Sequence, residues 1–74
     1  MDFFQRLPIE IFSQSLSGVV EEPIAPRQPG RVRLMGISWA ARLATDSAFN
    51  LTVHQPVAVV GRQGNTLLVQ PQAD

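Results

Sequence analysis

The sequence has no cysteine, no lysine and no tyrosine, and its only histidine is His54. Without cysteine, the chain cannot form disulfides, thiolate nucleophiles, iron–sulfur ligands or thiolate zinc sites. Without lysine, it can use neither Schiff-base chemistry nor a Ser–Lys dyad. One imidazole among scattered carboxylates does not build a zinc site. From these absences we expect a protein that is not an enzyme and that holds no cofactor and no metal.

Charge and long apolar runs are also scarce. Six acidic residues balance six arginines, so the formal net charge of the 74 residues is zero. This neutrality argues against binding nucleic acid or anionic membranes by charge alone. No run of about 18 apolar residues is present to span a membrane, and no cationic segment opens a signal peptide. We therefore expect a cytoplasmic location, with membrane association only through a partner.

Short alternating segments predict an all-β domain over residues 18–71. The segment 31–35 alternates polar and apolar residues, as in a half-buried strand. The glycine-rich turn at 61–65 separates two apolar runs, which is typical of a hairpin. The predicted strands are 18–22, 31–35, 38–44, 57–61 and 66–70. Because five short strands must close or leave exposed edges, we predict a small five-stranded OB-like barrel. Its expected core residues are Val32, Leu34, Trp39, Leu43, Val57, Val59, Leu67 and Val69.

The two ends of the chain differ from this pattern. Residues 1–17 form a hydrophobic N-terminal arm, in which Ile9, Phe12 and Leu16 have the spacing of one helical face. Ile9 and Ile11 also fit the alternation of a strand. We predict a short helical or irregular arm, followed by the barrel at 18–71 and a frayed tail at 72–74.

The arm is unusually apolar for a segment of its length. Its large side chains are Phe3, Phe4, Leu7, Ile9, Ile11 and Phe12. One interpretation packs them over the chain's own barrel. A second makes them a surface for self-association or for a protein partner. A third lays the segment on a membrane surface, which Asp2 and Glu10 disfavour beside Arg6 alone.

Three arginines suggest a second binding surface. Arg31 and Arg33 share one face of a predicted strand, and Arg42 lies across the hairpin near Trp39. Arginines beside an aromatic platform on an OB barrel are how single strands of nucleic acid are bound. The alternatives are an outer face paired with nearby glutamates and a face that docks an acidic protein. The alternation of Trp39 with Ala41 favours a core position for the indole.

Two other groups of residues could suggest catalysis. Asp46, Ser47 and His54 contain the residue types of a hydrolase triad, but such residues occur in most chains of this length. Glu21 and Glu22 are adjacent on a predicted strand, so their side chains point to opposite faces and cannot share one substrate bond. We interpret Asp46, Ser47 and His54 as loop residues. We interpret Glu21 and Glu22 as a solvated strand end.

The order of several short motifs resembles the soluble C-terminal domain of NfeD-like proteins. The motifs are Pro29-Gly30-Arg31-Val32-Arg33, then Gly36, Trp39 with Ala41-Arg42, the run Val57 to Val60, the glycine turn, and Leu67-Leu68-Val69 with Pro71. Together they cover residues 18–71. Near position 54 the family often has a glycine, where this sequence has His54, a residue that tolerates a positive φ better than a branched one.

The resemblance implies a five-stranded OB-fold barrel that binds other proteins. Family members usually carry transmembrane helices before this domain, and many are encoded beside stomatin- or flotillin-like membrane scaffold proteins. Longer relatives add a Ser–Lys protease, which a chain without lysine cannot reproduce. We therefore expect a non-catalytic interaction module that docks to such a scaffold or to itself. Its expected contact residues are Phe3, Phe4, Leu7, Phe12, Arg31, Arg33 and Arg42. The alternative is a barrel that binds single-stranded nucleic acid through the arginines.

Overall fold

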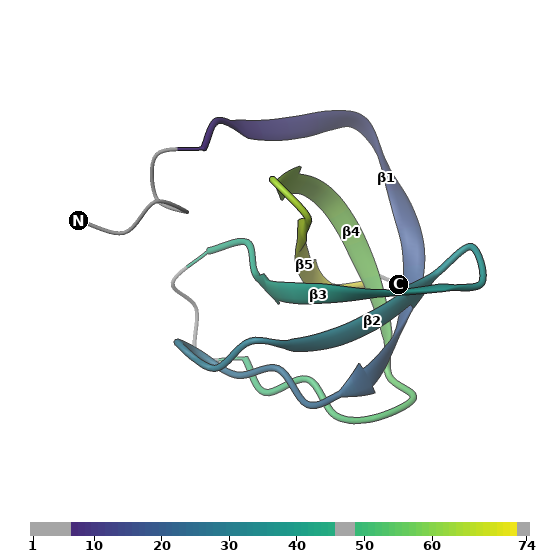
Figure 1. Cartoon of the computed structure of the whole chain (residues 1–74). Helices are drawn as coiled ribbons and strands as arrows, with labels where there is room; N and C mark the ends of the chain where they lie inside the picture. Colours follow the sequence, from purple (N-terminus) through teal and green to yellow (C-terminus); the bar gives the residue numbers. More distant parts are fainter. Residues whose placement is uncertain (1–6, 46–48, 73–74) are drawn as a thin grey trace.

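Five β-strands form one closed barrel in the computed structural model, which describes residues 7–45 and 49–72 (Figure 1). The strands are β1 (Ile9–Glu22), β2 (Gly30–Leu34), β3 (Ile37–Leu43), β4 (Pro56–Gln63) and β5 (Thr66–Pro71). Around the barrel their order is β1-β2-β3-β5-β4, and β4 pairs back with β1. The predicted fold class, an all-β five-stranded barrel, is confirmed.

The β2–β3 hairpin follows from its turn residues. Met35 and Gly36 both have positive φ, 53° and 79°, as the two central residues of a type I′ turn require. The turn sets the register, which pairs Leu34 with Ile37 and Val32 with Trp39. Both strands lie within one residue of their predicted bounds.

One of the strand pairs in the barrel is parallel. β3 runs parallel to β5, with Ala41 opposite Leu67 and Leu43 opposite Val69. All the other strand pairs are antiparallel. The β4–β5 hairpin confirms the prediction at the glycine turn, but the parallel pair joins strands that are far apart in the sequence.

Residues 9–17 are a strand, and this corrects the helical interpretation of the arm. They form the first part of β1, where Ile9 pairs with Gln63 and Ile11 with Gly61. The register then shifts between Ile11 and Leu16, because extra residues of β1 bulge out of the ladder. The four-residue spacing of Phe12 and Leu16 therefore marks a bulge rather than a helical turn.

The core lies between the inward faces of all five strands. Seven of the eight predicted core residues are buried, and Trp39 is half-buried against the core cluster. Ile24 and Leu51, each 1% exposed, come from the two long connections and exchange backbone hydrogen bonds of 3.0 and 2.8 Å. Both side chains belong to the core cluster, so the two connections add to the core from outside the five strands.

Candidate functional site

The described residues contain no arrangement suited to metal chemistry. Among them, no group of three or more His, Cys, Asp or Glu side chains could hold a metal ion. His54 is exposed in the turn before β4, and its predicted companions Asp46 and Ser47 lie outside the described residues. Within the same part of the chain, no helix is long and apolar enough to cross a membrane.

Arg33 on β2 is held by its own barrel. Its Nε donates to Oε2 of Glu21 on β1 at 2.8 Å, and its Nη2 lies 2.7 Å from the same oxygen. Its Nη1 donates to the carbonyl oxygen of Gly36 at 2.8 Å. The guanidinium therefore links β1 to the β2–β3 turn, although 54% of the side chain is exposed.

The pKa of the Glu21 carboxyl is lowered from its ordinary value of 4.5. The largest cause is a side-chain hydrogen bond with Ser38, and the hydrogen bond and charge of Arg33 act in the same direction. Desolvation acts against them. The carboxylate is thus stabilised by the neighbouring strands, as expected for an ion pair within a sheet.

Arg31 is held in the same network through Ser38 on β3. Its Nε donates to Oγ of Ser38 at 2.9 Å, and its Nη2 donates to the carbonyl oxygen of Ser38 at 3.2 Å. Ser38 therefore lies between Arg31 and Glu21. Sequence reasoning missed this serine because a lone serine on a strand carries no signal of its own.

Arg42 on β3 connects to the start of the described chain. Its Nη2 donates to Oε1 of Gln63 at 2.6 Å, and Nε2 of Gln63 donates to the carbonyl oxygen of Leu7 at 2.9 Å. A longer hydrogen bond of 3.4 Å joins Nη1 of Arg42 to the carbonyl oxygen of Leu43. Gln63 thus couples the arm to β3, a role that no sequence pattern indicated.

The predicted arginine surface is therefore divided. Arg31 and Arg33 make hydrogen bonds across β1, β2 and β3, whereas Arg42 turns toward Gln63 near the β4–β5 turn. The aromatic platform that the nucleic-acid alternative needs is also missing from this face, because Trp39 packs against the core, as its alternation with Ala41 predicted. The pairing with glutamate that we considered as an alternative is present at Glu21.

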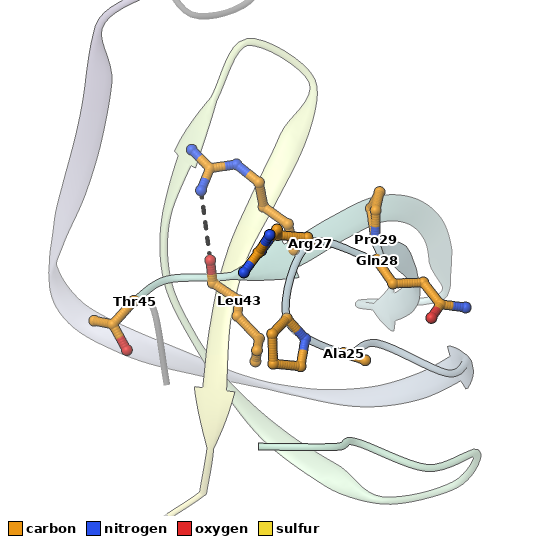
Figure 2. Close-up of a pocket in the computed structure, with 8 residues that line it drawn as sticks. Ala25, Arg27, Gln28, Pro29, Leu43 and Thr45 are labelled. Carbon is orange, nitrogen blue, oxygen red and sulfur yellow. Dashed lines mark hydrogen bonds between the residues drawn. The ribbon is translucent and has the colours of Figure 1, made fainter. Parts of the chain in front are cut away.

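A hollow of about 250 Å³ lies between the β1–β2 connection and the end of β3 (Figure 2). The connection contributes Arg27 and Pro29, and β3 contributes Arg42 and Leu43. The dashed line in Figure 2 is the Arg42 hydrogen bond to the Leu43 carbonyl oxygen. No acidic side chain lines the hollow among the described residues. No motif in the sequence marks Arg27 as a site residue.

Of the four arm residues expected to contact a partner, the structure describes Leu7 and Phe12. Phe12 packs against the core and Leu7 is half-buried, so both are engaged by the barrel itself. Phe3 and Phe4 lie outside the described residues. The described arm residues with the most exposed apolar surface are instead Ile9 and Ile11, which are 53% and 67% exposed, followed by Leu16 at 36%.

The first part of β1 also has an unpaired edge. Residues 9–11 and 16–17 pair only with β4, and the pairing of β1 with β2 begins at Val19. Residues 12–15 pair with neither strand. An extended edge with exposed apolar side chains can accept a further strand. Among the described residues, none other than those of β4 pairs with residues 9–11 and 16–17 in a ladder, although Nε2 of Gln72 donates to Oγ of Ser17 at 3.4 Å.

One protein family matches most of the chain. The family model of the NfeD-like C-terminal, partner-binding domain matches residues 16–71. The match confirms the resemblance derived from the motifs. No curated protein and no solved structure matches the chain.

Proposed function

This chain belongs to the NfeD-like C-terminal, partner-binding domain family, and we propose that it acts without catalysis, by docking to a membrane scaffold protein of the stomatin or flotillin class. The match over residues 16–71 carries the proposal, because it identifies the barrel as a protein-interaction module. The docking would hold the barrel at the cytoplasmic face of a membrane through its partner.

The surface that we assign to this docking is the first part of β1. An extended segment of the scaffold would pair with the unpaired edge at residues 9–17 and cover the exposed side chains of Ile9 and Ile11. Backbone hydrogen bonds would supply affinity, and contacts with the isoleucines would supply selectivity.

The test is the affinity of the full chain for a purified stomatin- or flotillin-like scaffold in detergent. Deleting residues 1–15 would be uninformative, because it removes the residues of β1 that pair with the end of β4. Point variants are better: Ile11→Ser removes an exposed apolar contact, and Gln14→Pro blocks edge pairing by removing a donor. Phe49→Ser is the control, since Phe49 is 49% exposed in the β3–β4 connection.

We expect Ile11→Ser and Gln14→Pro to weaken scaffold binding while Phe49→Ser leaves it unchanged. Circular dichroism should show that all three variants keep the fold. Absence of binding to any scaffold of these classes contradicts the proposal.

Single-strand nucleic-acid binding is the competing function, and its test is separate. Arg31 and Arg33 already donate to Ser38, Glu21 and Gly36. Salt-sensitive binding of an oligonucleotide that is lost when Arg31, Arg33 and Arg42 are replaced would favour this alternative.

A further inference from the structure

The turn that carries Arg27 has an unfavourable residue at its corner. The backbone groups of Ala25 and Gln28 exchange two hydrogen bonds of 2.9 Å, with Pro26 and Arg27 between them. Proline is common at the first corner position of a type II turn, and the second position needs a positive φ, so it favours glycine or asparagine. Arg27 occupies that position with φ 59°.

An arginine in a left-handed backbone conformation is less stable than a glycine there, because its Cβ crowds the following carbonyl oxygen. Such outliers gather at functional sites, where the surrounding structure maintains them. The Arg27 guanidinium makes no hydrogen bond or ion pair with another described residue, so no such contact offsets the cost. The turn places the positive charge of Arg27 at the hollow, which Arg42 also lines.

From this geometry we propose that the hollow binds a carboxylate side chain of an acidic segment on the partner protein. The Arg27 guanidinium offers donors for a paired interaction with a carboxylate. Arg42 adds a second positive charge, and its bonds to Gln63 and Leu43 fix its position. This inference rests on the proposed function, because it names the chemistry of one part of the docking partner.

The size and lining of the hollow favour a protein carboxylate. Its volume, about 250 Å³, is below the roughly 300–1,000 Å³ of pockets that enclose drug-sized ligands, so it suits a single side chain. Its walls include Pro26, Pro29 and Leu43 but no aromatic residue. A nucleic-acid strand would lack a platform for stacking its bases there.

The site is tested on the full chain by NMR titration with a short, end-blocked peptide containing two glutamates. Saturable amide shifts should group at residues 25–29 and 42–45. The same peptide with glutamines in place of glutamates should give no saturable shift. Inorganic phosphate and an oligothymidylate are titrated in parallel, and binding of these probes in place of the acidic peptide would overturn the assignment to a carboxylate.

The decisive variant is Arg27→Gly, which relieves the backbone and removes the guanidinium. It should raise the melting temperature and weaken peptide binding by about tenfold or more, since charge-assisted hydrogen bonds are lost. Arg62→Gln is the control. It also removes one arginine charge, from the exposed ion pair with Glu10, and should leave peptide binding unchanged. Unchanged affinity in Arg27→Gly overturns the inference.

The two proposals fail in different ways. If the scaffold binds the wild type and Arg27→Gly equally well, the carboxylate site is overturned and the docking function stands. If the acidic peptide binds as described but no scaffold binds, the docking function is overturned and the carboxylate site stands.

Discussion

Gly61 on β4 lies against the carbonyl oxygen of Glu10 on β1, and a Cβ at this glycine would overlap that oxygen. The same Cβ would stand 3.2 Å from the Cα of Ile11. The absence of a side chain at Gly61 is therefore what lets the first part of β1 join β4. The exposed edge that we assign to partner docking depends on this approach.

Gly61→Ala should separate the first part of β1 from β4. We expect a loss of about 1–3 kcal/mol, as for other overpacked sites, together with faster hydrogen exchange at residues 9–11. Urea unfolding and amide exchange measure the two effects. Gly36→Ala is the control, because its Cβ would meet nothing within 4 Å and only its positive φ is disfavoured. Unaltered exchange at residues 9–11 in Gly61→Ala would show that the close approach does not hold β1 in place.

His54 stands where the family often has glycine, and its φ is 74°. Its backbone N–H donates to the carbonyl oxygen of Val20 at 2.8 Å, which fixes the turn before β4. His54→Gly and His54→Asn should be at least as stable as the wild type, whereas His54→Val should lose about 1 kcal/mol or more because a branched residue resists this conformation. Thermal melts give the ranking, and a valine variant as stable as the wild type would refute it.

The Glu21 carboxylate should make the barrel sensitive to acid. Because the pKa of Glu21 is lowered in the folded chain, its contribution to stability is fully present above the unfolded value near 4.5. That contribution is lost as the pH falls through the lower folded pKa. The midpoint of urea unfolding should fall over this range in the wild type, and the fall should be smaller in Glu21→Gln. Glu22→Gln controls for the change in net charge. An identical acid profile in Glu21→Gln would exclude the network with Ser38 and Arg33 as a source of stability.

Trp39 is half-buried against the core cluster, opposite Val32 in the β2–β3 hairpin. Trp39→Ala should cost about 3 kcal/mol, which is most of the stability expected for a domain this small. We expect the cooperative thermal transition to disappear. Ile37→Ala, at a residue 56% exposed in the same strand, should change little. A cooperative melt of Trp39→Ala near the wild-type temperature would mean that the indole is peripheral to the core.

The sequence was most informative where a local rule determines structure. Alternation over residues 31–35 predicted β2, and the apolar run that begins at Val57 predicted β4. The positive φ of His54 also follows from its comparison with a family glycine. Each of these features depends on residues that are close together in the chain.

Features that depend on distant residues were not predictable. The bulge between Ile11 and Leu16 gave an extended segment the spacing of a helix. The roles of Ser38 and Gln63 arise only when strands from different parts of the chain meet. Arg27 was missed because its left-handed backbone and its place in the hollow require the closed barrel.

The most direct test of the docking account is hydrogen exchange of the full chain, free and bound to a purified stomatin- or flotillin-like scaffold. The account predicts that binding slows exchange at residues 9–17, where β1 has an unpaired edge, with the rest of the barrel little changed except around Arg27 and Arg42. A stable complex in which residues 9–17 exchange as fast as in the free chain would contradict it.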